Sequence, residues 1–272
     1  MIDVLLSTYN GERYIYDLLK SLENQTFKDF QVIIRDDGSK DNTTHIINEF
    51  INNTSLKIRL LTDNVNLRST KSFETLTKIS DSDYFMFCDQ DDIWLPEKIE
   101  LTYNKIKELE QNNKEGVPCL VFSDLKVVDD SLNTISDSFF KLQKTNPDVC
   151  YNIWKCIAIS VVPGCTMLMN KFCKKYILPI PSFRVHDHWS ICNIAYYGKC
   201  DYISESTILY RIHASNTIGL QHLNKTNAFK KISAFKKLIP IYWKELNSFN
   251  FSVKYGYVIF YKIYYFLKRF FS

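Results

Sequence analysis

The hydrophobic positions of the first hundred residues fall into two alternating patterns. Short continuous apolar runs, typical of buried strands, alternate with stretches in which apolar residues recur every three or four positions, as on one face of a helix. Pro96 fits the first turn of one such helix, where a missing N–H is tolerated. The predicted strands lie within residues 4–7, 30–39, 56–64 and 83–92, and the predicted helices within residues 10–25, 46–51, 70–79 and 96–112.

This alternation predicts an α/β fold with a mostly parallel sheet that is covered by helices on both faces. Such sheets bind ligands beyond the carboxyl ends of their strands. Three polar clusters come at those ends, namely Ser7–Asn10, Asp36–Ser39 and Asp89–Asp92. We therefore expect the three clusters to converge on one crevice.

The pattern is less regular in the second half of the chain, which begins with a predicted strand at residues 119–124. A polar stretch covers residues 129–148, and no internal repeat or low-complexity segment precedes residue 225. We expect one domain over residues 1–224, followed by a different kind of segment. Further predicted elements are a turn and strand within residues 161–170, a helix at 188–198 that ends at Gly198, and the stretch 206–216.

The last part of the chain differs from the rest in charge and in aromatic content. Residues 225–272 contain ten Lys or Arg, one acid (Glu245) and fifteen of the forty aromatic residues, whereas residues 1–224 have a net charge of −5. Residues 253–271 interleave aromatic and basic side chains, and no charge-free run reaches the roughly 20 residues of a spanning helix. This pattern is typical of an amphipathic segment on an anionic membrane surface. A helix packed on the body or on a partner is the alternative.

Eight cysteines are scattered along the chain without a CxxC pair, which indicates neither a zinc knuckle nor a disulfide framework. The first ten residues have no basic region before their short apolar run, so they do not resemble a secretory signal. We therefore expect a reducing, cytoplasmic location.

Three carboxylates follow the fourth predicted strand in the motif "DQDD", residues 89–92. Neighbouring carboxylates repel one another unless a cation, hydrogen-bond donors or water offset the repulsion. Along an extended chain, Asp89 and Asp91 project to one side and Asp92 to the other. Because Mg²⁺ and Mn²⁺ prefer oxygen ligands, a divalent-cation site is one interpretation, and a solvated turn is the other.

Several motifs, in order along the chain, resemble those of the family 2 inverting glycosyltransferases of the GT-A fold. The segments "STYNGERYIYDLLKSLENQTFKDFQVIIRDDGSKDNT" and "YFMFCDQDDIWLPEKI" carry the resemblance within residues 1–100. "GCTMLMN", "HDHW" and "YRIHASNTIG" extend it more loosely to bacterial enzymes that resemble rhamnosyltransferases of cell-surface polysaccharides. The resemblance implies a nucleotide-binding half at residues 1–100 and an acceptor-binding half at residues 101–224.

The first two polar clusters, by this resemblance, hold the nucleotide of a sugar donor. Asp37, with Asp36, would accept a hydrogen bond from the N3–H of uracil or thymine, although Gly38 alone would also explain an Asx turn. Arg68 is the nearest match to a basic residue beside the nucleotide, and Lys71 is the alternative. The implied nucleotide-sugar-binding residues are Thr8, Tyr9, Asn10, Glu12, Asp36, Asp37, Arg68, Asp89, Gln90 and Asp91.

The resemblance also implies a Mg²⁺ or Mn²⁺ ion that neutralises charge on the departing diphosphate. Asp91 would ligate this ion, Asp89 would touch the ribose, and Asp92 would assist directly or from behind. His213 matches a histidine that reaches the metal or the diphosphate in relatives. A surface or capping histidine is the alternative for His213.

The family's catalytic base is an acid at the head of a helix, and Asp187 matches it. Asp187 would take the proton of the acceptor hydroxyl as that oxygen attacks the anomeric carbon with inversion. A carboxylate that caps the helix is a compatible alternative. A zinc site that includes the neighbouring His186 and His188 is a further alternative.

Four residues are candidates for the acceptor or sugar pocket. Trp94 and Trp189 would form walls against a sugar, or would pack in the core. Gly164 would allow the backbone to approach the donor sugar or the acceptor closely, and His186 is expected in the same pocket.

Together these features predict a metal-dependent inverting glycosyltransferase at the inner face of a bacterial membrane. It would use a UDP- or dTDP-sugar and a lipid-linked or polysaccharide acceptor, with no nucleic-acid partner. A catalytically silent nucleotide-sugar-binding partner in a polysaccharide assembly complex is the alternative, but it would be expected to lose the base or a metal ligand, and Asp91 and Asp187 are both present. A nucleotidyltransferase would usually have a Gly-rich basic loop after its first strand, and "STYNGERY" is not such a loop.

Overall fold

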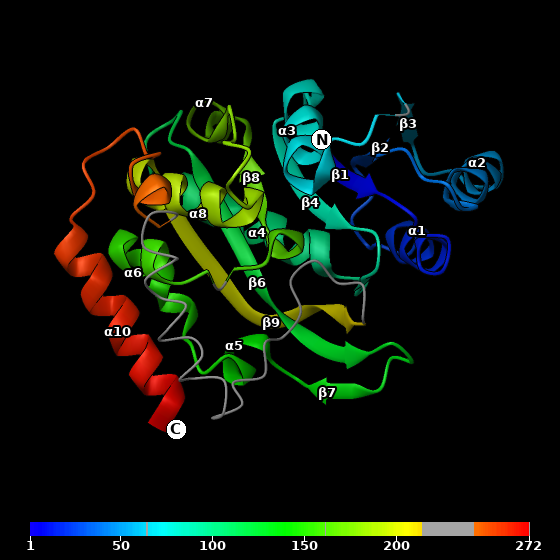
Figure 1. The fold of residues 1–272 in the computed structure, drawn as a ribbon. Helices are drawn as coiled ribbons and strands as arrows, with labels where there is room; N and C mark the ends of the chain where they lie inside the picture. The colour runs from blue at the N-terminus through cyan, green and yellow to red at the C-terminus, as the bar shows by residue number, and fades with distance from the viewer. Residues whose placement is uncertain (64, 161, 214–241, 272) are drawn as a thin grey trace.

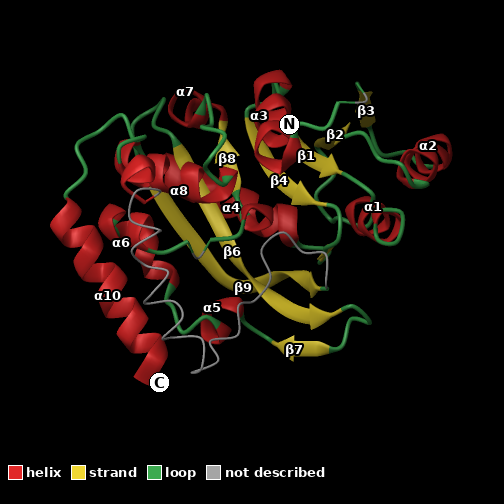
Figure 2. Ribbon diagram, viewed as in Figure 1, coloured by secondary structure: helices red, strands yellow, loops and turns green. Residues whose placement is uncertain are grey.

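One mixed sheet with helices on both faces organises the chain (Figures 1 and 2). The computed structural model describes residues 1–63, 65–160, 162–213 and 242–271. The strand order is β3-β2-β1-β4-β8-β6-β9-β5, and β7 pairs with β6 outside this path. The predicted α/β class is thereby confirmed.

The first half of the chain forms the parallel part of the sheet, as predicted. β2 and β4 flank β1 on its two sides, and β3 pairs with β2, all in parallel. The short strand β5 (Ile93–Trp94) escaped prediction because two residues show no periodicity. The other elements are β1 (Ile2–Thr8), α1 (Ile15–Glu23), β2 (Phe30–Asp36), α2 (Thr43–Asn53), β3 (Ile58–Thr62), α3 (Arg68–Ile79), β4 (Tyr84–Asp89) and α4 (Lys98–Gln111).

The second half extends the sheet with mixed strand directions. β8 lies antiparallel between β4 and β6, β6 is parallel to β9, and β5 is antiparallel to β9. The predicted stretch 206–216 is the end of β9, except that residues 214–216 lie outside the described residues. The strands are β6 (Cys119–Asp129), β7 (Thr134–Ser136), β8 (Leu168–Asn170) and β9 (Lys199–Ile212). The helices are α5 (Phe139–Leu142), α6 (Ile153–Ala158), α7 (Lys174–Ile177), α8 (His186–Tyr197), α10 (Tyr255–Phe271) and the 3₁₀ turns η1 (Pro147–Tyr151), η2 (Gly164–Thr166) and η3 (Lys171–Cys173).

Two hydrophobic cores cover the two faces of the sheet. Alternate side chains of β1 show the division, because Val4 and Leu6 pack in the core that contains α1, α2 and α4, whereas Leu5 packs in the core that contains α3 and α8. Every one of these β1 side chains is fully buried. A strand that is apolar on both sides therefore reads as a continuous run, which is the pattern from which it was predicted.

The C-terminal segment packs on the second core. α10 lies beside α6 at the edge of the molecule (Figure 1), and its residues Val258 and Tyr265 are buried in this core. Phe249, in the stretch before α10, stacks on Trp189 of α8 at 5.2 Å between ring centroids. One side of α10 therefore packs on the body of the protein, as in the alternative to membrane binding. The predicted boundary at Asn224 lies outside the described residues. No helix of the described residues combines the length and the apolar character needed to cross a membrane.

Candidate active site

The carboxyl ends of β1, β2 and β4 lie at one level of the sheet. Thr8 pairs with Asp36 across β1 and β2, and Ser7 pairs with Asp89 across β1 and β4. Because the three strands are parallel, the loops that follow them meet at the same edge. The predicted convergence of the three polar clusters is confirmed.

Polar side chains of the loop after β1 tie it to its neighbours. Asn10 Oδ1 and Glu12 Oε2 accept hydrogen bonds from main-chain N–H groups of the loop after β2, at 2.8 Å and 2.9 Å. The Gln90 side chain accepts from Tyr9 N at 2.8 Å and donates to Tyr9 O at 3.0 Å. These hydrogen bonds join the loops at this edge of the sheet, whereas Tyr9 is 46% exposed.

Asp36 forms an Asx turn, the alternative that Gly38 indicates in the sequence. Its Oδ2 accepts from the N–H groups of Gly38 at 3.1 Å and Ser39 at 2.8 Å, and its Oδ1 accepts from Thr8 Oγ1 at 3.1 Å. Gly38 has a φ of +82°, in the left-handed region that favours glycine. The buried Asp36 carboxylate therefore holds the turn together.

Asp37 organises the approach to α3. Its carboxylate accepts from the main-chain N–H groups of Leu67 at 2.7 Å and Arg68 at 2.8 Å, and it pairs with the buried guanidinium of Arg35. Arg68 is exposed in this arrangement. Lys71, the other basic candidate, pairs with the Glu74 carboxylate. Arg68 therefore contacts Asp37 through its main chain and leaves its side chain exposed, whereas Lys71 is engaged by Glu74.

Asp89 and Asp92 meet Cys165 behind the DQDD turn. One ligand atom from each of the three residues lies within 4.8 Å of the other two. Asp92 is 1% exposed, and its Oδ2 has no hydrogen-bond partner among the described residues. Burial, followed by the charges of Asp91 and Asp89, raises the pKa of Asp92 well above its ordinary value. Such a group of acids is favourable for a cation.

Asp91 belongs to a second contact at the same turn. Its Oδ2 lies 2.9 Å from His213 Nε2, and the imidazole stacks on the Tyr14 ring at 4.8 Å. Of the three predicted metal ligands, Asp91 and His213 are thus neighbours, whereas Asp92 joins Asp89 and Cys165. Carboxylate oxygens and an imidazole nitrogen fit Mg²⁺ or Mn²⁺, so the residues present fit the expected ion.

Two residues of this site were missed from the sequence, namely Cys165 and Lys98. Lys98 is fully buried, its Nζ lies 4.0 Å from the centre of the Trp94 ring, and it has no hydrogen-bond partner among the described residues. Burial lowers its pKa to about 8, against the opposing influence of nearby groups that include Asp92. Neither residue carries a spacing signal, because each meets the acids only through tertiary packing.

Both tryptophans are core residues. Trp94 is 1% exposed beneath Lys98, and Trp189 is 3% exposed. The Trp189 indole N–H donates to Ile177 O at 2.8 Å, and its ring stacks on Phe249. The expectation that they line a sugar pocket is therefore corrected, and the core alternative holds for both.

Asp187 lies in the first turn of α8, partly exposed beside the acidic turn. The N-cap residue of α8 is Val185, so Asp187 is not the helix cap. Its carboxylate accepts from the His188 main-chain N–H. Burial raises the pKa of Asp187 to about 6, and the charge of Asp187 contributes to raising the pKa of Asp89 to about 7, after burial and Asp91. The two carboxylates are therefore close enough to interact.

His186 is buried where Gly164 meets the start of α8. Its ring stacks on Phe73 at 4.1 Å, neither ring nitrogen has a partner among the described residues, and burial lowers its pKa to about 3. A Cβ on Gly164 would lie 2.9 Å from His186 Nε2 and 3.3 Å from Asp187 Cβ. The close approach that Gly164 permits is thus to α8 itself, beside the Asp187 carboxylate.

The zinc alternative finds no support at the two histidines. His188 Nε2 lies 2.9 Å from Cys156 O, on the α6 side of the helix, whereas His186 packs against Phe73. Within the described ranges, the one group of three or more candidate ligands is that of Asp89, Asp92 and Cys165.

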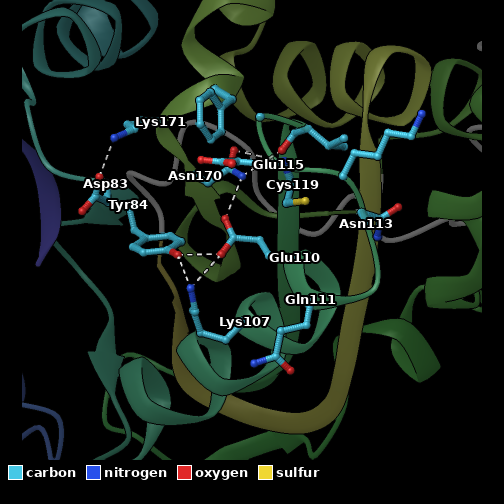
Figure 3. Close-up of a pocket in the computed structure, with 14 residues that line it drawn as sticks. Asp83, Tyr84, Lys107, Glu110, Gln111, Asn113, Glu115, Cys119, Asn170 and Lys171 are labelled. Atoms are coloured by element: carbon cyan, nitrogen blue, oxygen red, sulfur yellow. Dashed lines mark hydrogen bonds and ion pairs between the residues drawn. The ribbon is translucent and has the colours of Figure 1, made fainter.

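A separate cavity of about 520 Å³ lies away from these acids (Figure 3). It opens where β4 and β6 begin, and Tyr84, Glu110 and Lys107 face one another in it. The Tyr84 hydroxyl donates to Glu110 Oε2 at 2.6 Å, and Lys107 Nζ lies 3.2 Å from the same oxygen. This network satisfies its own charges and braces α4 against the sheet.

Known proteins resemble this chain in both sequence and fold. Residues 3–174 match the model of "Glycosyl transferase family 2". The dTDP-rhamnosyl transferase RfbG of Shigella flexneri is 30% identical over 231 residues, which cover 79% of this chain and 73% of that protein.

Two solved structures share the fold at lower sequence identity. The S. aureus TarS 1-349 complex with UDP-GlcNAc matches at a TM-score of 0.64 and 17% identity, over 99% of this chain and 72% of that one. The mannosyltransferase PcManGT of Pyrobaculum calidifontis, in complex with GDP-Man and Mn²⁺, matches at a TM-score of 0.56 and 15% identity, over 79% and 58% of the two chains.

Mn²⁺ binding is predicted to strengthen with pH. The cation needs ionised carboxylates, and Asp89, with its pKa raised to about 7, is mostly protonated at lower pH. One competing proton weakens binding about tenfold at pH 6 relative to pH 8. Isothermal titration calorimetry with Mn²⁺ across this range would measure the change, and Asp89→Asn should reduce it. A pH-independent affinity would contradict the prediction.

Proposed function

Since the chain belongs to glycosyl transferase family 2 and is a glycosyltransferase of the GT-A fold, we propose that it transfers a sugar, with inversion, from a UDP- or dTDP-sugar to a lipid-linked or polysaccharide acceptor. The observation that carries the proposal is that Asp187 lies against Gly164, next to Cys165, which meets Asp89 and Asp92 behind the turn after β4. In the proposed complex, the base and the diphosphate-binding edge would lie on the two sides of the anomeric carbon, as inversion requires.

The donor nucleotide is assigned to the edge formed by β1, β2 and α3. The exposed side chains of Tyr9 and Arg68 are the proposed direct contacts, because a ring can stack on a base and a guanidinium can pair with phosphate. The remaining nucleotide-side residues preorganise the pocket through the hydrogen bonds of their loops. They are Thr8, Asn10, Glu12, Asp36, Asp37 and Gln90. The names of RfbG and TarS, which specify dTDP-rhamnose transfer and bound UDP-GlcNAc, support a pyrimidine donor.

A Mg²⁺ or Mn²⁺ ion is the proposed cofactor, and it would neutralise the charge that grows on the leaving diphosphate. Asp91 and His213 would hold it from one side, and Asp89 and Asp92 would supply the remaining negative charge. The Mn²⁺ in the PcManGT complex supports this assignment.

Asp187 is the proposed general base. It would accept the proton of the acceptor hydroxyl while that oxygen forms the bond to the anomeric carbon and the bond to the diphosphate breaks. A carboxylate with a pKa of about 6 is mostly ionised at neutral pH, yet it is a stronger base than an ordinary aspartate. The silent-partner alternative explains neither the presence nor the basicity of this side chain.

The acceptor side of the proposal includes an anionic membrane at the inner face of the cell. While Val258 and Tyr265 face the core, the opposite side of α10 exposes Tyr257, Phe260, Ile263, Tyr264 and Leu267. Lys254 and Lys268 are the exposed basic residues of this stretch among those described, and a basic residue is worth about 1 kcal/mol near anionic lipids. Docking of α10 in the interface would bring Asp187 to an acceptor that lies in the bilayer plane.

A donor screen tests the proposed reaction. Purified protein with Mn²⁺ or Mg²⁺ is expected to release UDP or dTDP from at least one sugar nucleotide, faster with added polysaccharide or lipid-linked glycan and not at all after chelation with EDTA. Coupled detection of the released nucleoside diphosphate measures the rate. Turnover that persists after complete metal removal would contradict the metal assignment.

Asp187→Asn is predicted to separate binding from transfer. The amide keeps the shape of the side chain but cannot take a proton, so kcat should fall by about 10²- to 10⁴-fold while the UDP affinity changes less than about twofold. Asp81→Asn, at an exposed position, is the matched control and should keep full turnover. Undiminished turnover of Asp187→Asn would remove Asp187 from its role.

Replacing exposed residues of α10 is predicted to release the protein from anionic vesicles. Phe260→Glu with Ile263→Glu removes apolar area and adds negative charge, so the bound fraction in co-sedimentation should fall at least about tenfold. Point substitutions are preferable to truncation because Val258 and Tyr265 belong to the core. Ile135→Glu, on β7, is the control. Equal sedimentation of all three proteins would refute the membrane proposal.

A further inference from the structure

Arg184 is a buried cation that plays no part in the chemistry described so far. It is 4% exposed, three positions before Asp187, in the loop that leads into α8. A buried guanidinium is unfavourable unless its N–H groups and its charge are satisfied. The partners that satisfy it come from a distant part of the chain.

Among the described residues, the side-chain hydrogen bonds of Arg184 go to the stretch that precedes α10. Nη2 donates to Glu245 O at 2.7 Å, and Nε donates to Ser248 Oγ at 3.2 Å. Nη1 lies 3.5 Å from the carboxylate of Glu245, which is the single acid of residues 225–272. The Phe249 ring covers the guanidinium, with 4.5 Å from Cζ to the ring centre.

The stretch before α10 also contacts Trp189, which follows Asp187 in the sequence. Trp189, two positions after Asp187, stacks on Phe249 with an angle of 11° between the rings. Its main-chain N–H donates to Val185 O at 3.0 Å, which closes the first turn of α8 around Asp187. Phe249 thus packs on both Arg184 and Trp189, and Asp187 lies between them in the sequence.

Helix α3, on the proposed donor side of the site, holds the main chain of the loop before α8. Thr70 Oγ1, in the first turn of α3, donates to Arg184 O at 2.9 Å, and Lys71 Nζ donates to Ile180 O at 2.7 Å. Arg68, the proposed nucleotide contact, is the first residue of the same helix. Arg184 therefore joins α3 through its carbonyl and the C-terminal segment through its side chain.

We propose that Arg184 is a positioning residue, which fastens the loop that carries Asp187 to residues 245–249 and so sets the place of the base relative to the donor. The inference rests on the proposed role of Asp187. It makes the C-terminal segment a part of the transfer machinery, in addition to any role at a membrane. A base that is displaced by about 1 Å loses much of its effect, even when the donor still binds.

Arg184→Gln is the direct test, because it removes the positive charge and the forked N–H groups of the guanidinium while keeping a polar side chain. The kcat for release of UDP or dTDP from the donor, with water as the acceptor, should fall about tenfold or more. The affinities for UDP and Mn²⁺, measured by calorimetry, should stay within about twofold of the wild type, and amide hydrogen exchange at residues 186–190 should become faster. Arg184→Lys should recover only part of kcat, because an ammonium cannot reproduce the fork.

Two further variants serve as a replacement test and as a control. Ser248→Ala removes the Nε acceptor and the hydrogen bond from Ser248 Oγ to Glu245 O, but it keeps Glu245 O as the acceptor of Arg184 Nη2, so it should fold normally and lower kcat about two- to fivefold. It replaces Arg184→Gln if that protein fails to fold. Arg59→Gln removes an exposed guanidinium on β3 and should leave all the measurements unchanged. A kcat within twofold of the wild type in Arg184→Gln, or in Ser248→Ala where it serves as the replacement, would overturn the inference. A loss of UDP affinity equal to the loss of kcat would do the same.

Parallel assay of Asp187→Asn separates this inference from the proposed function. If Asp187→Asn keeps wild-type turnover, the base assignment fails, whatever Arg184→Gln does. If Asp187→Asn is inactive and Arg184→Gln keeps its kcat, only the positioning role fails.

Discussion

Repulsion among the carboxylates around the end of β4 is the constraint on which the rest of the site depends. Burial and neighbouring negative charge raise the pKa values of Asp89 and Asp92, and burial alone raises the pKa of Asp187. Within the part of the chain that the structure describes, the Lys98 ammonium lies on the buried side of these acids, and His213 Nε2 contacts Asp91. A group of acids held close together is complementary to a divalent cation, whereas burial keeps Asp187 basic enough to accept a proton. Repulsion among the acids thus prepares the proposed metal site, and burial prepares the proposed base.

The parts of the fold that the sequence predicted are those that depend on local periodicity and on one topological rule. Continuous runs such as Val32–Ile34 identified buried strands, and the parallel order then required Thr8, Asp36 and Asp89 to meet at one edge. Short β5 and the antiparallel insertion of β8 carry no comparable period. They are determined by pairing with strands that are distant in the sequence.

The sequence predicted which kinds of residue form the site, but it did not always predict where their side chains point. Asp187 and the DQDD turn could be located from motifs, whereas Cys165 and Lys98 could not, since each reaches the acids only through packing. Trp94 and Trp189 fit either a sugar wall or a core equally well in sequence terms. Only the contacts above and below each ring decide between the two, and they place both in the core.

The aromatic residues of the C-terminal segment serve two surfaces, and this explains why the segment is apolar nearly all round. A helix with apolar residues on every side needs a covering on each of them. Val258 and Tyr265 meet the core beside α6, and Phe249 covers Arg184 and Trp189 near the proposed base, whereas Phe260 and Ile263 point away from the protein. Because the inward contacts involve different residues from the outward ones, the proposed positioning of the base and the proposed attraction to a membrane can be varied independently by point substitution. Deleting the segment would change both at once, so a loss of activity in a truncated protein could not be assigned to either cause.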